Sequence, residues 1–191
     1  MHVLESSFGI SPATTVLDVG GYWMNWSFLQ QKPKLTLLNL LTESRREPGV
    51  SYVSGDGLCL PFADKSFDLV YSNSVIEHVG GWEQQVQFAS EAMRCGRSYY
   101  VQTPYKWFFF EPHLLTPFMH WFPDRIRRKV LWTSWRFVLV RPTKGEEEDF
   151  LKIRLLSIKE MRGLFPDGEI WKEKFLGLTK SLIVVRRSGP V

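Results

Sequence analysis

Short, nearly continuous apolar segments that end in glycine or small polar residues constrain the fold more than any other feature. The segments cover residues 13–19, 35–41, 50–53, 66–72 and 98–103. Their length and their β-branched residues predict buried strands. Helices or turns are expected between them, and this alternation is typical of a parallel sheet that is covered on both faces.

Two helices are expected among these strands. Residues 82–95 predict the longer one, because Val86, Ala89 and Met93 recur at helical spacing and a glycine follows as a stop. A shorter helix is expected over residues 26–31, where a proline soon ends the pattern.

The C-terminal part of the chain has a different pattern. Ser157 and Glu160 form a capping box that begins a further helix. Residues 170–176 and 181–185 then predict two strands on either side of residues 177–180. Because the two strands lie so close in sequence, they favour an antiparallel hairpin at the end of the sheet.

Together these elements predict an α/β fold. It is a Rossmann-like, doubly wound and mostly parallel sheet with helices on both faces and a C-terminal antiparallel hairpin. A single domain over residues 1–191 is expected, in which residues 105–156 form a long insertion after the fifth strand.

The composition excludes several classes of protein. With 23% charged and 44% hydrophobic residues, the chain is globular and not disordered. Two cysteines are too few for a disulfide scaffold, and Cys59 and Cys95 lack metal-ligand spacing, so no metal site is expected. The first residues carry no secretory signal, and no apolar run reaches the roughly 18 residues of a membrane span. A cytoplasmic location is the expectation.

Small polar residues follow the predicted strands at the point where each strand ends. Asp18 ends the first strand, Asn39 lies near the end of the second, Asp56 follows the third, and Ser72 and Asn73 close the fourth. Ligands of open α/β sheets bind outside the carboxyl ends of the strands. Each residue alone is also compatible with a simple turn, but four strand ends in the same order favour a binding site.

The pattern favours a nucleoside as the ligand. Gly20 and Gly21 let the backbone approach a ligand closely, and a polar residue at the end of the second strand suits a ribose hydroxyl. Tyr22 and Trp23 stand where a dinucleotide site needs a G-x-G-x-x-G loop for its phosphates, and no Walker loop is present. We therefore expect a nucleoside without phosphates.

Three sequence stretches carry a resemblance to a known family. They are residues 16–21 (VLDVGG), 55–62 (GDGLCLPF) and 66–79 (SFDLVYSNSVIEHV). In combination the stretches resemble class I S-adenosylmethionine-dependent methyltransferases, most of all the broad methyltransferase type 11 group. The resemblance spans about residues 13–104 and implies S-adenosylmethionine as the cofactor.

The resemblance assigns parts of the cofactor to particular residues. It implies that the amino-acid end is held by Asp18, Gly20 and Gly21. It implies that the ribose is held by Asn39. It implies that the adenine is held by Asp56, Gly57 and Leu58. It implies that Ser72 and Asn73 lie beside the methionine part.

The chain departs from the family pattern in two places. Asn39 stands where members usually have an acid, which predicts weaker binding of the ribose hydroxyls. The usual third glycine of the first motif is absent, and residues 22–25 are bulky. A non-catalytic relative of the fold, which binds a partner or a membrane surface through the insertion, is therefore the alternative to an enzyme.

Methyl transfer to an oxygen or carbon atom usually needs a base. His78 is the leading candidate because it follows the fourth strand, and Glu77 beside it is a candidate to orient it or to bind the substrate. His113, beyond the fifth strand, is a second candidate base or substrate ligand. The structural alternatives are helix capping or packing for the first two residues and a role in loop structure for His113.

The insertion holds much of the chain's unusual aromatic content of 15%. Four of the eight tryptophans lie in it. Residues 124–144 contain seven basic residues and one acidic residue. Among the possible roles of the insertion, we rank a lid over the acceptor first. This lid could also contact a membrane surface peripherally. A packed helical subdomain is the plain alternative, and nucleic acid ranks last because no binding motif occurs.

These observations predict methyl transfer from S-adenosylmethionine to a small-molecule, lipid-linked or saccharide acceptor. The sequence sets neither the acceptor atom nor the oligomeric state.

Overall fold

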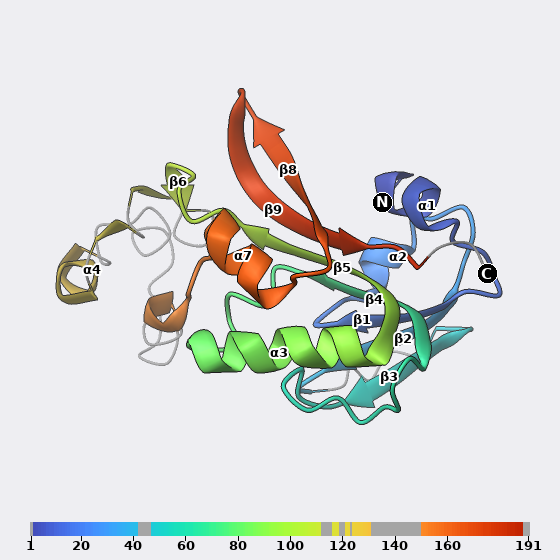
Figure 1. Cartoon of the computed structure of the whole chain (residues 1–191). Coiled ribbons are helices and arrows are strands. Elements are labelled where there is room, and N and C mark those ends of the chain that lie inside the picture. Colours follow the sequence, from blue (N-terminus) through green and yellow to red (C-terminus); the bar gives the residue numbers. More distant parts are fainter. Residues whose placement is uncertain are drawn as a thin grey trace.

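A seven-stranded sheet with helices packed on it organises the chain (Figure 1). The computed structural model describes residues 2–41, 47–111, 116–118, 121–122, 124–130 and 150–188. The helices in this part are α1 (His2–Phe8), α2 (Trp23–Trp26), α3 (Trp82–Cys95), α4 (Asp124–Val130) and α7 (Ile158–Leu164). The strands are β1 (Thr15–Val19), β2 (Lys34–Asn39), β3 (Val50–Ser54), β4 (Phe67–Asn73), β5 (Gly96–Pro104), β6 (Phe110–Glu111), β7 (Thr116–Pro117), β8 (Glu169–Phe175) and β9 (Leu178–Arg186).

The strand order confirms the predicted fold class. The order is β3-β2-β1-β4-β5-β9-β8, with β1 to β5 parallel and with β9 antiparallel to both of its neighbours. The chain runs outward in one direction from β1 to β3 and in the other from β4, so the order reverses between β1 and β4. A doubly wound sheet binds its ligands at the carboxyl ends of the strands beside this reversal.

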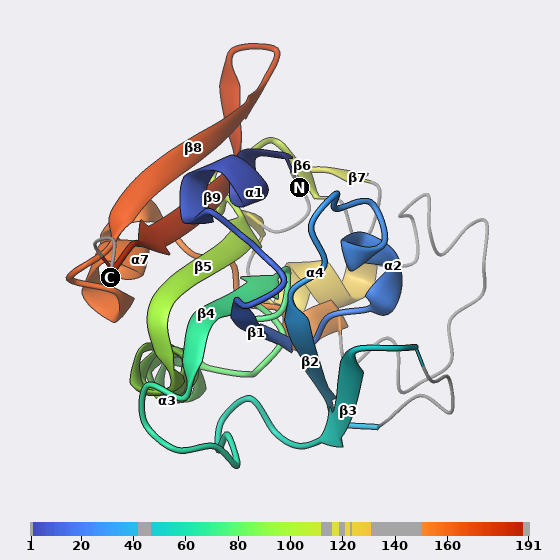
Figure 2. The same ribbon diagram turned by 90° about the vertical axis from the view of Figure 1, so that its right-hand side faces the viewer.

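Two apolar clusters cover the two faces of the sheet. On one face α3 and α7 pack over inward side chains such as Leu17 and Val70. On the other face α1 and α2 pack over Val16 and Leu69, which are the neighbours of those residues in β1 and β4. Successive residues of a strand point to opposite faces, so nearly continuous apolar strands are needed to fill both clusters. Figure 2 shows α3 and α7 on the same side of the sheet.

The predicted short helix over residues 26–31 is wrong in position, because the helix is α2, over Trp23–Trp26. Tertiary contacts of Trp26 decide this. The ring of Trp26 is fully buried and packs edge-on against Tyr71, with 5.2 Å between ring centroids. Its indole N–H also donates to Asp18, so the turn that carries Trp26 is held against β1 and β4.

The bounds of α3 agree with the prediction, but its buried face includes a residue that the apolar pattern missed. Val86 is 44% exposed, whereas Gln85 is fully buried. The amide nitrogen of Gln85 donates to the carbonyl oxygens of Ile76 and Arg154, at 2.9 Å in each case. A buried polar side chain with these partners is stable in the core, and apolar spacing cannot identify it.

The C-terminal elements follow the prediction, with one difference. The capping box of Ser157 and Glu160 is present at the start of α7. The hairpin is also present, but its connection is Leu176 and Gly177 alone, and β9 begins at Leu178. Both turn residues have positive φ, 49° and 81°, which suits a two-residue turn between twisted strands.

Within the described residues, no helix combines the length and the apolar character that a membrane span requires. The same residues contain no group of three or more His, Cys, Asp or Glu side chains that is placed to share a metal ion.

Candidate active site

A cavity of about 500 Å³ lies at the carboxyl ends of β1, β2 and β3. We call it the switch-point cavity, because β1 borders the reversal of strand order. Its lining residues are Val19, Gly20, Tyr22, Leu38, Asn39, Leu40, Leu41, Gly55, Asp56, Gly57, Leu58, Val75, His78 and Val79. The volume lies within the range of about 300–1,000 Å³ that small-molecule sites span.

Glycines form the closely packed parts of the cavity wall. Gly20 has a φ of 78°, and a Cβ atom there would lie 2.5 Å from Cγ2 of Val75. A Cβ atom on Gly57 would lie 2.9 Å from the ring of Phe88. Neither position accepts a side chain without displacing its neighbour, so both glycines keep the backbone next to the cavity.

Asn39 and Asp56 are the polar side chains that reach the switch-point cavity from β2 and from the end of β3. The amide nitrogen of Asn39 donates to the carbonyl oxygen of Gly21 at 2.9 Å, so recognition of a ligand hydroxyl falls to Oδ1. Oδ1 of Asp56 accepts from the backbone N–H of Leu58 at 2.9 Å. Oδ2 of Asp56 is then the atom suited to accept from a ligand amine.

Asp18 is buried beneath the Gly20–Gly21 loop and does not itself line the cavity. Its Oδ2 accepts from Nε1 of Trp26 at 2.6 Å, and its Oδ1 has no hydrogen-bond partner among the described residues. A Cβ atom on Gly21 would lie 1.6 Å from Oδ2, so only glycine fits above the carboxyl group. Complete burial raises the pKa of Asp18 to about 7, against a partly offsetting effect of the Trp26 hydrogen bond.

The residues at the end of β4 have separate roles. Ser72 is fully buried and donates to the carbonyl oxygen of Val19 at 3.1 Å, which ties β4 to β1. Asn73 is exposed, and neither residue lines the switch-point cavity. Ser74 follows with a φ of 57°, and its hydroxyl contacts Oε1 of Gln102 at 3.1 Å. Non-glycine residues with positive φ are uncommon in proteins as a whole, and those that occur cluster at functional sites.

The structure brings His78 and Glu77 together, but only His78 reaches the switch-point cavity. The His78 side chain is 42% exposed, and its Nε2 lies 4.0 Å from Oε1 of Glu77. Glu77 is fully buried, and its Oε2 accepts from the hydroxyl of Thr103 at 2.9 Å. Glu77 is therefore placed to orient His78 and not to touch a ligand. His113 lies outside the described residues.

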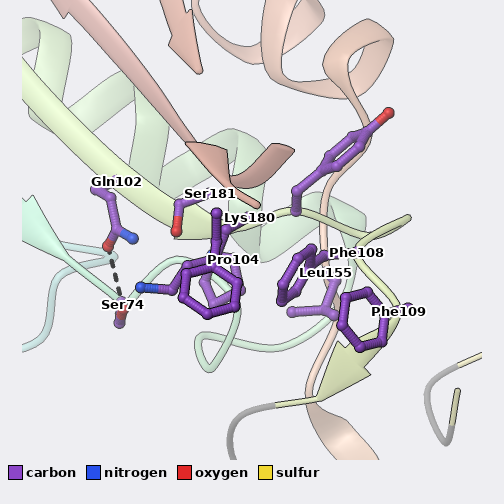
Figure 3. A pocket seen from close by; sticks show the side chains of 10 residues that line it. Ser74, Gln102, Pro104, Phe108, Phe109, Leu155, Lys180 and Ser181 are labelled. Carbon is purple, nitrogen blue, oxygen red and sulfur yellow. Dashed lines mark hydrogen bonds between the residues drawn. The ribbon is translucent and has the colours of Figure 1, made fainter. Parts of the chain in front are cut away.

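A second cavity, of about 560 Å³, lies beyond the carboxyl end of β5 (Figure 3). We call it the apolar cavity. It is lined by Ser74, Gln102, Pro104, Tyr105, Phe108, Phe109, Leu155, Phe175, Lys180 and Ser181. Figure 3 shows Ser74 and Gln102 at one end and Phe108, Phe109 and Leu155 at the other. The cavity therefore has a polar end and an apolar end.

The lining of this second cavity comes in part from the predicted insertion and in part from the hairpin. The insertion is predicted to cover an acceptor, and its residues Phe108 and Phe109 line the apolar cavity. Lys180 and Ser181 were missed because they come from the hairpin. The antiparallel pairing of β9 with β5 sets Ser181 opposite Pro104, and that pairing joins residues far apart in the chain.

The two cavities share a wall. Ser74 lines the apolar cavity, and the next residue, Val75, lines the switch-point cavity. A ligand in one cavity and a ligand in the other would therefore both lie against the loop that follows β4. Such an arrangement suits the transfer of a small group between two bound molecules.

Comparisons with known proteins relate part of the chain to methyltransferases. A family model described as a methyltransferase domain matches residues 30–98. No match occurs among curated protein sequences.

Solved structures share the fold over nearly the whole chain. One similar structure is a chain from a complex between the Haloferax volcanii Trm112 methyltransferase activator and a putative methyltransferase. It is 13% identical to this chain, with a TM-score of 0.58, and the match covers 96% of this chain and 86% of that one. A putative methyltransferase from Bacillus halodurans C-125 is 15% identical, with 96% of each chain covered and a TM-score of 0.58. Geranyl diphosphate C-methyltransferase from Streptomyces coelicolor A3(2) is 13% identical, with 96% and 77% covered and a TM-score of 0.57.

The family-model match over residues 30–98 and the shared fold agree with the resemblance to class I S-adenosylmethionine-dependent methyltransferases that the sequence carries. The switch-point cavity fits this cofactor in size and in its polar groups, since Asn39 suits ribose hydroxyls and Asp56 suits the adenine amine. The match of residues 30–98 to a methyltransferase domain, together with the shared fold, supports methyl transfer as the type of reaction.

Proposed function

We propose that the chain holds S-adenosylmethionine in the switch-point cavity and methylates an acceptor that is bound in the apolar cavity. The single observation that carries this proposal is the shared wall, in which Ser74 and Val75 are consecutive residues that face different cavities. The cofactor supplies a methyl group on a sulfonium centre, which is transferred to a nucleophile by in-line displacement. The protein then has to align the two molecules and keep water out.

Three groups of the switch-point cavity would hold the cofactor. Oδ1 of Asn39 would accept from a ribose hydroxyl, and Asp56 would accept from the adenine amine. Gly20 would leave room for the amino-acid end, since any side chain there would meet Val75. A neutral amide accepts more weakly than a carboxylate, so Asn39 predicts moderate affinity.

The lining of the apolar cavity supports an acceptor that has an extended apolar part. Aromatic and aliphatic side chains form one end, whereas the other end offers the hydroxyl of Ser74 and the amide of Gln102. Lys180 adds a cation at the cavity wall, which suits an anionic or strongly polar group on the acceptor. A lipid-linked or other amphiphilic small molecule fits this lining better than a free saccharide does.

The nucleophile of such an acceptor would give up a proton, and His78 is the residue that we assign to take it. Among the described residues, His78 is the histidine whose side chain lines the switch-point cavity, and its backbone N–H donates to the carbonyl oxygen of Val75 at 2.8 Å. Glu77 would act as a positioning residue, because its carboxylate lies beside the imidazole and is held by Thr103.

Calorimetry with S-adenosylhomocysteine, the product form of the cofactor, tests the cofactor half of the proposal. The wild-type protein is expected to bind it, and Asp56→Ala is expected to weaken binding by about tenfold, as for the loss of a hydrogen bond to a charged group. Glu83→Ala is the matched control, since it removes an exposed carboxylate from the start of α3. A folded Asp56→Ala variant with unchanged affinity would remove the adenine assignment. The non-catalytic alternative predicts no binding by the wild-type protein.

A further inference from the structure

The tip of the β8–β9 hairpin presents apolar side chains to solvent. Leu176 in the turn is 84% exposed, and Phe175 and Leu178 on either side of it are 53% exposed. In Figures 1 and 2 the hairpin projects beyond the rest of the described structure. Exposed apolar groups that are gathered at one projecting point are typical of a contact surface.

Leu176 is an unfavourable residue for the turn that it occupies. Its φ is 49°, and Asn, Asp or Gly is strongly preferred at the first position of a two-residue turn with positive φ. Asn followed by Gly177 would form the turn with less strain, and the hairpin itself gains nothing visible from the leucine. A local rule that is broken in this way points to a role for the side chain outside the fold.

The hairpin tip borders the apolar cavity. Phe175 lines the cavity from the hairpin side. On the insertion side, Trp107, Phe118 and Trp121 form an exposed aromatic cluster, with 6.2 Å between the two Trp rings and 5.0 Å between Phe118 and Trp121. Phe109, which lines the cavity, continues this cluster at 6.3 Å from Phe118. Apolar groups therefore flank the same cavity on two sides.

Cations accompany these apolar groups. Lys172, Lys174 and Lys180 are exposed on the outer part of the hairpin, where the acid between them, Glu173, lies 3.8 Å from Lys180. Lys106 lies over the ring of Trp107 at 5.6 Å. Exposed Trp and aliphatic side chains beside lysines match the composition of segments that lie at a membrane surface.

We propose that the hairpin tip and the aromatic cluster dock on an anionic phospholipid surface, and that the acceptor reaches the apolar cavity from that surface. The docking stands on the geometry alone, whereas the delivery of the acceptor rests on the proposed function. The lysines decide against a second copy of the chain as the occupant, because pairing two tips would bring like charges together. An anionic surface instead complements them.

Co-sedimentation with vesicles of mixed phosphatidylcholine and phosphatidylserine tests the docking without cofactor or activity. The wild-type protein is expected to bind these vesicles at low salt, more weakly at high salt, and least to phosphatidylcholine alone. Leu176→Asn is expected to reduce binding by about tenfold, as for the loss of one inserted leucine. It should leave the hairpin at least as stable, because Asn accepts the positive φ.

Val86→Asn is the matched control, since Val86 is 44% exposed on α3, which lies on the opposite side of the molecule from the hairpin tip in both views. This variant should bind vesicles as the wild type does. Absence of vesicle binding at low salt, or equal binding by Leu176→Asn, overturns the proposal. Self-association that is lost in Leu176→Asn, without vesicle binding, would show that the tip contacts a second copy instead. Cofactor binding with no vesicle binding would leave the proposed function standing and reject only the docking.

Discussion

Replacing Asp18 by Asn should change how the stability of the protein depends on pH. Burial raises the pKa of Asp18 in the folded protein to about 7, whereas its ordinary value is 3.8. Between these pH values the folded protein keeps a proton that the unfolded chain has released. The free energy of unfolding therefore falls as pH rises, by about 1.4 kcal/mol for each pH unit. The loss is about 4 kcal/mol by pH 7, and it stays constant above that pH.

Asp18→Asn removes this dependence because the amide does not titrate in this range. The amide oxygen keeps the hydrogen bond from Trp26, but the NH₂ group replaces Oδ1, which has no partner among the described residues. An unsatisfied buried donor lowers stability by about 1–3 kcal/mol at every pH. The test is therefore how the difference in the free energy of unfolding between the variant and the wild type changes with pH. That difference should move in favour of the variant by about 4 kcal/mol between pH 4 and pH 8.

Urea unfolding followed by circular dichroism at several pH values measures this difference. Asp68→Asn is the control of opposite sign, because the backbone N–H of Thr15, foremost, and its hydroxyl lower the pKa of Asp68. Its carboxylate stabilises the fold above its ordinary pKa, and this contribution is lost as pH falls through the lowered value. The Asp68→Asn variant should therefore lose most stability, relative to the wild type, at neutral pH. A difference for Asp18→Asn that stays the same from pH 4 to pH 8 would refute the reasoning.

Two further substitutions test the wall of the switch-point cavity and the anchoring of the chain at the end of the insertion. Gly20→Ala should prevent detectable binding of S-adenosylhomocysteine and lower the free energy of unfolding by at least about 1 kcal/mol, because φ is 78° and the added Cβ meets Val75; normal affinity in calorimetry would contradict this. Arg154→Ala should lower the free energy of unfolding by about 1–3 kcal/mol, because the guanidinium donates to Gln85 at 2.5 Å and pairs with Glu160. A wild-type melting temperature would show that Arg154 does not anchor the chain that returns from the insertion.

Most of the sheet could be predicted from sequence because its strands are defined locally. Apolar runs such as Leu35 to Leu38 are long enough to fill both faces, and glycines or polar residues mark their ends. The capping box at Ser157 is also a local signal, and it correctly predicted the start of α7. The candidate cofactor residues Asn39 and Asp56 were identifiable for the same reason, since parallel strands bring their carboxyl ends to one edge.

Features that depend on contacts between distant residues were not visible in the sequence. The position of α2 follows from the buried contact of Trp26 with Tyr71 of β4, and the burial of Gln85 depends on the carbonyl oxygen of Arg154, 69 residues away. The apolar cavity needs β9 beside β5, which brings Lys180 next to residues of the insertion. No local pattern of residue types encodes such pairings.

The central claim is that the cofactor lies in the switch-point cavity with its methyl group at the wall formed by Ser74 and Val75. A crystal structure with S-adenosylmethionine tests this most directly. We expect the adenine beside Asp56, the ribose beside Asn39, and the methyl group directed across the shared wall toward the apolar cavity. A cofactor bound elsewhere, or a methyl group directed away from that wall, would contradict it.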